Sequence, residues 1–306
     1  MDSLIRMHIS VLLQEVVDGL APQPGDVILD ATLGGGGHSE ALCQNVHEAT
    51  FICLDADEKA IERSKERLST CSCTFHFYQT NFRNLDRALI EFGITSINRA
   101  VFDLGLSSYQ LESSVEGASE HLGRGFSFRG SEPLTMTYAS TVTPDMITAE
   151  QIVNEWAEEN IATIIESYGE DRQARRIARA IVSARAVRPI TTTAELRDII
   201  ERAVPRRGKI HPATKTFQAL RMTVNDELPA LQEGLTKAWS LLAPQGRIAV
   251  ISFHSLEDRF VKNFFRDEAK KGTGILITKK PLVPTDDEVW ENPRSRSAKL
   301  RIIEKI

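Results

Sequence analysis

Apolar and polar positions alternate in blocks along the first third of the chain. Each short apolar run is followed by a segment whose apolar residues have helical spacing. The runs are 26–30 (DVILD), 49–55 (ATFICLD), 73–80 (CTFHFYQT) and 99–105 (RAVFDLG), and the helical segments are 38–47, 57–68 and 84–92. Strands that alternate with helices predict right-handed βαβ crossovers, so we expect a mostly parallel sheet with buried central strands.

This pattern stops after residue 105 and returns near residue 246. Residues 106–142 are rich in Gly and Ser and have no clear period. Helical spacing covers 145–203 and 212–242, and strands at 246–253 and 297–306 flank a helix at 255–265. The simplest architecture is one α/β domain, formed by 1–112 and 212–306, that is interrupted by a helical insertion at 113–211.

Composition excludes several classes of protein. With 42% hydrophobic and 26% charged residues, the 306-residue chain has the balance of a globular protein that buries a core. No apolar run approaches the roughly 18 residues of a membrane span, and Gln14 and Glu15 come too early for a signal peptide. The four cysteines lack the paired spacing of a zinc site. We therefore expect a cytoplasmic protein without a metal.

Charge is unevenly distributed. The net charge is −5, yet residues 171–221 contain 13 Lys and Arg against 4 Asp and Glu. A strongly cationic segment in an acidic protein is how a localised binding surface for a polyanion would look. Charge alone equally fits a solvated helix face, so both interpretations stay open at this point.

The stretch DATLGGGGHS, residues 30–39, places four glycines between a predicted strand and a predicted helix. A P-loop needs Lys and then Ser or Thr after its glycines, whereas His38 follows here. The dinucleotide pattern G-x-G-x-x-G is nearly met by Gly34 and Gly36. Asp30, four residues before Gly34, instead resembles the first motif of Rossmann-like methyltransferases that use S-adenosylmethionine. Glycines at Gly36 and Gly37 would let the backbone approach such a cofactor closely.

Three more side chains follow the ends of predicted strands, where ligands of open α/β sheets bind. Asp55 ends the second strand, where a carboxylate can accept both ribose hydroxyls. Phe82 follows the third strand and is placed to pack on the adenine. Asp103 ends the fourth strand and can reach the cofactor or the acceptor. The alternative for Asp103 is that it caps the turn after it.

Blocks from one end of the chain to the other then resemble a known family. They are HISVLLQEV, DATLGGGGHS, DLGLSSYQLE, RGFSF, YGEDRQARRIARAIV, HPATKTFQALRMTVNDEL, ISFHSLEDRFVKNFF and NPRSRSAKLR, in order from His8 to Arg301. Together they resemble the bacterial 16S ribosomal RNA (cytosine-N4)-methyltransferase family. The resemblance implies a Rossmann-like methyltransferase domain with an inserted helical domain for RNA recognition, and methyl transfer from S-adenosyl-L-methionine to a cytidine of 16S rRNA in the small ribosomal subunit.

The resemblance also implies functional residues. Its cofactor-binding positions fall on Gly36, Gly37, His38, Asp55, Phe82, Asp103 and Gln110. Of these, His38 and Gln110 depend on the resemblance alone. Where the family reads PLDMRM, this chain has PLTMTY, so Thr135 and Thr137 replace an acid and an arginine. Any role of those two charges in seating RNA is then missing or relocated.

Cytosine's exocyclic amine is a poor nucleophile because its lone pair is delocalised into the ring. Transfer therefore needs the amine oriented and hydrogen-bonded by acceptors. We expect Asp103, or the backbone after it, to accept from the amine while Ser107 helps to fix the base. Candidate RNA contacts are Lys215, Arg221, His254, Arg294 and Arg296. The alternatives are plain surface cations and, for the His254 region, capping of a helix by Ser255.

Three hypotheses from different classes result. We favour an RNA cytosine methyltransferase. A nicotinamide-dependent oxidoreductase is disfavoured by Asp30 and by the missing third glycine. A catalytically weakened ribosome-assembly factor that still binds cofactor is motivated by Thr135 and Thr137.

Overall fold

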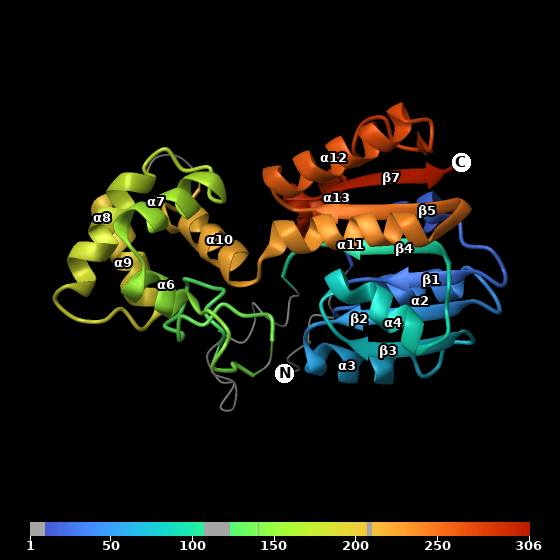
Figure 1. Cartoon of the computed structure of the whole chain (residues 1–306), viewed down its shortest axis with the longest axis horizontal. Coiled ribbons are helices and arrows are strands. Elements are labelled where there is room, and N and C mark those ends of the chain that lie inside the picture. The colour runs from blue at the N-terminus through green and yellow to red at the C-terminus, as the bar shows by residue number, and fades with distance from the viewer. Residues whose placement is uncertain (1–9, 107–122, 140, 207–209) are drawn as a thin grey trace. The chain divides into compact units, whose positions relative to one another are not determined.

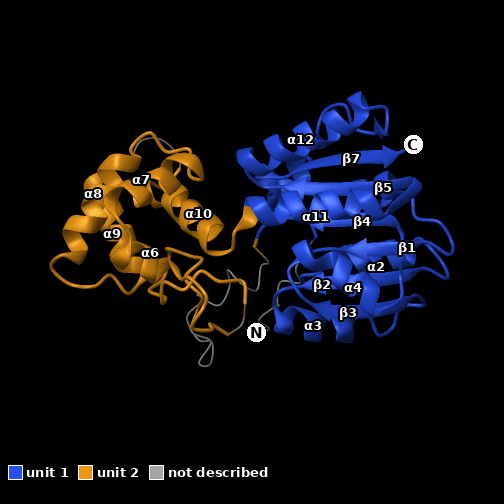
Figure 2. Ribbon diagram, in the orientation of Figure 1, with its two compact units in different colours: residues 1–105, 228–306 blue, residues 106–227 orange. Residues whose placement is uncertain are grey.

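The structure, a computed structural model, describes residues 10–106, 123–139, 141–206 and 210–306. The chain divides into two compact units (Figure 2). Unit 1 comprises Met1–Gly105 and Leu228–Ile306, and unit 2 comprises Leu106–Glu227. Unit 1 is thus formed by two stretches of sequence, with unit 2 between them in the chain.

Unit 1 contains a seven-stranded sheet with the order β3-β2-β1-β4-β5-β7-β6 (Figure 1). Its strands are β1 (Val27–Asp30), β2 (Thr50–Asp55), β3 (Thr74–Gln79), β4 (Ile97–Asp103), β5 (Leu242–Ser252), β6 (Gly274–Leu276) and β7 (Lys299–Lys305). Strands β1 to β5 pair in parallel, and β7 runs antiparallel to β5 and β6. The prediction of a Rossmann-like α/β fold is confirmed.

Helices cover both faces of this sheet. They are α1 (Leu13–Leu20), α2 (Gly37–Gln44), α3 (Glu58–Leu68), α4 (Leu85–Glu91), α11 (Glu227–Leu241), α12 (Ser255–Lys270) and α13 (Asp286–Glu291), with the 3-10 turns η1 (Phe82–Asn84) and η2 (Pro293–Ser297). Successive residues of one strand enter opposite cores: Ile28 packs with α1, α2 and α3, and Leu29 with α4, α11 and α12. Burial on both sides explains why these strands read as continuous apolar runs.

Unit 2 is helical. It contains α6 (Ala149–Glu155), α7 (Glu158–Ser167), α8 (Ala174–Arg185), α9 (Thr193–Ala203) and α10 (Ala213–Val224). Its own core includes Ile152, Ile165 and Ile177. Phe217 and Leu220 of α10 belong to this core. Helix α10 is therefore part of unit 2, whereas the boundary expected at residue 212 assigned it to the α/β part. No helix in the described parts of the chain is long and apolar enough to cross a membrane.

Local signals explain where the helices of unit 2 begin and end. Thr148 and Thr192 each form a capping box with the residue three positions on, at the starts of α6 and α9. The predicted helical run at 212–242 is two helices, because Asp226 has a left-handed backbone with φ of 50°. The chain changes direction there, between α10 and α11.

Candidate functional site

Three acids lie at the carboxyl ends of neighbouring parallel strands in unit 1. Asp30 ends β1, Asp55 ends β2 and Asp103 ends β4. Strand β1 lies between the other two, so all three acids occur at one edge of the sheet. Strand β1 connects to β2 on one side, and β3 connects to β4 on the other side of β1, a switch in direction at which open α/β sheets form ligand clefts.

The glycine loop between β1 and α2 has a backbone that only glycine adopts readily. Gly34 and Gly36 have φ values of 53° and 74°. A Cβ on Gly36 would lie 3.2 Å from Ser64 Oγ, and one on Gly37 would overlap the side chain of Ser10. Ser64 Oγ also donates to the Gly34 carbonyl at 2.9 Å. Gly36 and Gly37 therefore have no room for a side chain, and Ser64 of α3 holds the loop at Gly34.

Asp55 fixes the other side of this loop. Its Oδ2 accepts from the Gly34 N–H at 2.8 Å, and its Oδ1 accepts from the Asp57 N–H at 2.8 Å. Burial raises the pKa of Asp55 despite these bonds. Each carboxylate oxygen has a second lone pair, so the predicted acceptance of two ribose hydroxyls is compatible with both contacts.

Phe82, in η1 after β3, is held by its surroundings. Its ring lies edge-on to Phe102 with centroids 5.7 Å apart, and a Cβ on Gly234 of α11 would contact it at 2.7 Å. The residue is half-buried. Its predicted contact with an adenine ring stays a prediction.

Asp103 and His38 form the most unusual part of the site. Asp103 Oδ2 lies 3.7 Å from His38 Nδ1, and His38 Nε2 lies 3.0 Å from the Val11 carbonyl oxygen. Asp103 Oδ1 is buried without a hydrogen-bond partner. Burial, and then the nearby Glu257, raises the pKa of Asp103 to about 7, and burial lowers the pKa of His38. A buried acceptor without a partner is costly unless a ligand supplies a donor or a positive charge.

These groups fit S-adenosylmethionine. The glycine loop presents a backbone without side chains beside the acids, Asp55 offers acceptors for a ribose, and Asp103 Oδ1 offers an acceptor for a cationic group. Ser107 and Gln110 lie outside the described residues. Because residues 107–122 are not described, the alternative that Asp103 caps the turn after it stays open.

Asp30 holds both ends of the glycine loop through hydrogen bonds. Its Oδ2 accepts from Ser39 Oγ at 2.6 Å, and its Oδ1 accepts from the Thr32 N–H at 3.2 Å. It is 2% exposed, and burial raises its pKa to about 6. Thr32 was missed by the sequence argument, although it lies within the quoted motif: its Oγ1 accepts from the Asp103 N–H at 2.6 Å and so ties β4 to the loop.

The predicted RNA contacts do not share one arrangement. Arg221 pairs with Glu227 through two bonds of 2.8 and 2.9 Å, and Lys215 Nζ donates to the Glu170 carbonyl at 2.7 Å. Arg294 and Arg296 are exposed on η2. The five candidates therefore stay predictions, and Arg221 already has an intramolecular partner.

His254 caps a helix. Its Nδ1 accepts from the Glu257 N–H at 3.4 Å, and Glu257 accepts from the His254 N–H in return, which makes a capping box at the start of α12. The expected cap residue Ser255 is instead the first residue of the helix. The cap was misplaced because histidine is a less common cap than serine.

The altered PLTMTY segment lies in unit 2 and serves local structure. Thr135 Oγ1 donates to the Arg124 carbonyl at 2.8 Å, and Thr137 Oγ1 accepts from the Ala139 N–H at 3.2 Å. Leu134 before them and Met136 between them are fully buried in the helical core. The segment packs without the two charges of the family pattern.

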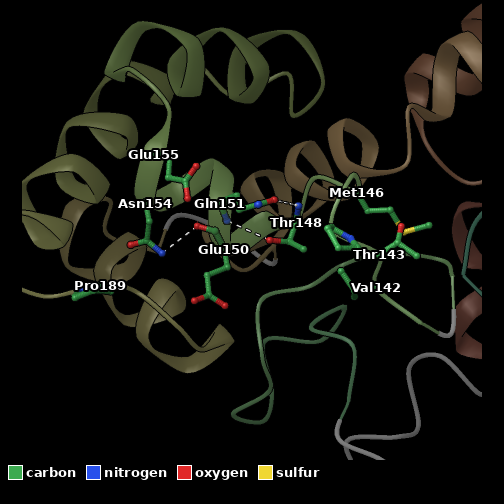
Figure 3. A pocket seen from close by; sticks show the side chains of 10 residues that line it. Val142, Thr143, Met146, Thr148, Glu150, Gln151, Asn154, Glu155 and Pro189 are labelled. Atoms are coloured by element: carbon green, nitrogen blue, oxygen red, sulfur yellow. Dashed lines mark hydrogen bonds between the residues drawn. The ribbon is translucent and has the colours of Figure 1, made fainter.

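Unit 2 also has an open hollow at the start of α6 (Figure 3). Val142, Thr143 and Pro189 contribute to its lining, and Asn154 donates to the Glu150 carbonyl beside it. None of the residues predicted for cofactor, catalysis or RNA lines this hollow.

Comparison with known proteins gives a consistent picture. The sequence model of the MraW methylase family matches residues 6–306. Three relatives are called ribosomal RNA small subunit methyltransferase H. The one from Synechococcus elongatus is 47% identical over 302 residues, which are 98% of this chain and 95% of the relative. The one from Persephonella marina is 43% identical and covers 98% and 99%. The one from Brevibacillus brevis is 40% identical over the whole of both chains.

A solved rRNA methylase from Streptococcus thermophilus is similar at 11% identity, with a TM-score of 0.44 over 99% of both chains. That likeness is too weak to bear on the site.

Proposed function

Because the chain belongs to the MraW methylase family, we propose that it transfers a methyl group from S-adenosylmethionine to the exocyclic N4 amine of a cytidine in 16S rRNA. The chain is a methyltransferase with S-adenosylmethionine as its methyl donor. The observation that carries the proposal is the unpartnered, buried Oδ1 of Asp103 at the carboxyl edge of the sheet, beside the glycine loop. The names of the relatives support a ribosomal substrate.

The chain's own residues supply orientation and acceptors. S-Adenosylmethionine provides a methyl group that its positively charged sulfur already activates. The glycine loop and Asp55 hold the cofactor in one position. Asp103 would accept from a donor at the same edge, either the cytosine amine, whose lone pair it would localise, or a cationic group of the bound cofactor. Because such transfer depends chiefly on alignment, no single strong base is needed.

The acceptor cytidine must be unstacked before its amine reaches a strand edge. A loop or linker of 16S rRNA within the small ribosomal subunit meets this need, and such a substrate places the reaction in the cytoplasm. We further propose that unit 2 recognises the RNA, supported by the excess of Lys and Arg in residues 171–221. An assembly factor with weakened catalysis is not favoured, because the segment that motivated it packs normally.

The decisive experiment maps the methyl group. Small subunits from cells that lack the modification are incubated with the protein and methyl-labelled S-adenosylmethionine, and the labelled nucleoside is identified by mass spectrometry. The proposal expects label on N4 of one cytidine. Label on another atom, or cofactor binding without transfer to any subunit or free 16S rRNA, would refute it.

A further inference from the structure

The Val11 carbonyl decides which nitrogen of the His38 imidazole carries the hydrogen. Nε2 lies 3.0 Å from the Val11 carbonyl oxygen, and a carbonyl oxygen only accepts, so Nε2 carries the hydrogen. A neutral imidazole has a single N–H, so Nδ1 presents a lone pair. That lone pair faces Asp103 Oδ2 at 3.7 Å. The side chain is 7% exposed, so burial opposes a second proton, which would make the ring positively charged.

If Asp103 were ionised, its negatively charged Oδ2 would face the lone pair of His38 Nδ1, and the two acceptors would repel each other. Its surroundings add to this cost, because Asp30 on β1 and Glu257 in the first turn of α12 are also acids. Arg67 of α3, whose charge contributes to the lowered pKa of His38, is itself paired with Glu40 at 2.6 Å. Among the described residues, no Lys or Arg pairs with Asp103.

We propose that His38 is a positioning residue: its Nδ1 keeps a proton on Asp103 until a cationic ligand reaches the unpartnered Oδ1. Asp103 Oδ2 and His38 Nδ1 are 3.7 Å apart, too far for a hydrogen bond, so the proton acts by removing the negative charge that would otherwise face the Nδ1 lone pair. When a positive group arrives at Oδ1, the O–H bond breaks and the proton passes to solvent, and no bond of the ligand changes. This inference rests on the proposed function, since it takes Asp103 as a cofactor contact.

The consequence is a proton release that accompanies cofactor binding. Burial raises the pKa of Asp103 to about 7, so below pH 7 most free molecules carry the proton. Binding needs the carboxylate, so affinity for S-adenosylmethionine falls about tenfold per pH unit below 7. Titration calorimetry in buffers with different ionisation enthalpies measures the release directly. We expect close to one proton at pH 6 and almost none at pH 8.

Two variants at His38 identify its role through the midpoint of this pH dependence. His38→Asn places an amide N–H near the position of Nδ1, where it donates to the carboxylate and moves the midpoint to lower pH by about one unit. The His38→Gln side chain can still reach the Val11 carbonyl but lacks the Nδ1 acceptor. The midpoint of the pH dependence should therefore also move to lower pH, by less than in His38→Asn. A residue with a structural role alone would lower affinity equally at every pH.

Asp26→Asn is the matched control. It changes a buried acid just before β1 that pairs with Arg99 at 3.4 Å, and it leaves Asp30, His38 and Asp103 in place. A midpoint that moves as far in Asp26→Asn as in His38→Asn, or one that does not move in His38→Asn, overturns the proposal. Wild-type binding without proton release at pH 6 overturns it without any variant. None of these results touches the identity of the methylated atom, which the labelling experiment tests separately.

Discussion

The two units hold their functional candidates in opposite ways. In unit 1, Asp103 keeps a buried oxygen without a hydrogen-bond partner. In unit 2, the guanidinium of Arg221 donates two hydrogen bonds to the carboxylate of Glu227, which also accepts one from Tyr138 Oη at 2.8 Å. A ligand site keeps polar groups unsatisfied until the ligand arrives, whereas a structural pair consumes them.

The same contrast divides the basic segment of unit 2. Arg185 donates to the Val153 carbonyl and Arg197 to the Phe128 carbonyl, so both support the fold. Arg175 and Arg176 of α8 are exposed and have no ion pair among the described residues. The number of Lys and Arg residues in a basic segment is therefore an upper limit on the number that can contact RNA phosphates.

The largest effect should come from removing the unpartnered acceptor of unit 1. Asp103→Ala should lower kcat/KM on ribosomal subunits by about 10³-fold, because the acceptor that aligns the reacting groups is lost. The matched control is Asp26→Asn, a buried acid just before β1 that accepts from the Gln23 N–H and pairs with Arg99 at 3.4 Å. It should reduce stability and leave kcat/KM of the folded protein near wild type. Equal loss in both variants would mean that Asp103 acts through folding.

Breaking the structural pair of unit 2 should act on stability. Side chains of Arg221 and Glu227 are only 15% and 9% exposed, so Arg221→Ala leaves a nearly buried carboxylate with Tyr138 as its remaining partner. We expect a loss of about 2–3 kcal/mol in the free energy of unfolding. Hydrogen exchange should show lower protection in α7 and α10 and unchanged protection in β1. Unchanged α10 protection together with weaker RNA binding would restore Arg221 as an RNA contact.

The sequence predicted the parts of unit 1 that depend on local pattern. Strands buried on both faces leave apolar runs, and parallel strands bring their carboxyl ends together, so Asp30, Asp55 and Asp103 were placed without coordinates. Strand β6 was missed because three residues with an exposed Ile275 show no apolar run. Helix α1 was also missed, because its eight residues were judged only as a possible leader.

Contacts between distant residues were not predictable in this way. The bond from His38 to Val11 spans 27 positions, and that from Asp103 to Thr32 spans 71. The pair of Arg221 and Glu227 is close in sequence, yet it depends on the left-handed turn at Asp226, which helical spacing does not show. The position of a charged residue at a strand or helix end was therefore predictable from the sequence, whereas its bonding partner was not.

A smaller effect separates backbone strain from ligand contact within unit 1. Gly36→Ala and Gly93→Ala both place a side chain at positive φ, 74° and 67°, so each should cost about 1 kcal/mol of stability. A Cβ at Gly93 meets nothing within 4 Å, whereas one at Gly36 meets Ser64 Oγ at 3.2 Å. Only Gly36→Ala should weaken binding of S-adenosylmethionine, by about tenfold in a calorimetric titration. Equal affinities in the two variants would remove the loop from the cofactor site.

The smallest effects test whether exposed arginines of either unit reach RNA. Arg296→Ala in unit 1 and Arg176→Ala in unit 2 each remove one exposed cation, so each should weaken binding to 16S rRNA about fourfold at 0.15 M salt. The slope of log affinity against log salt should become shallower by about 0.7, the value for one phosphate contact. Thermal unfolding should not change, in contrast to Arg221→Ala. A shallower slope in Arg296→Ala alone would place RNA recognition on unit 1, because the exposed face of α8 would then have no share in the phosphate contacts.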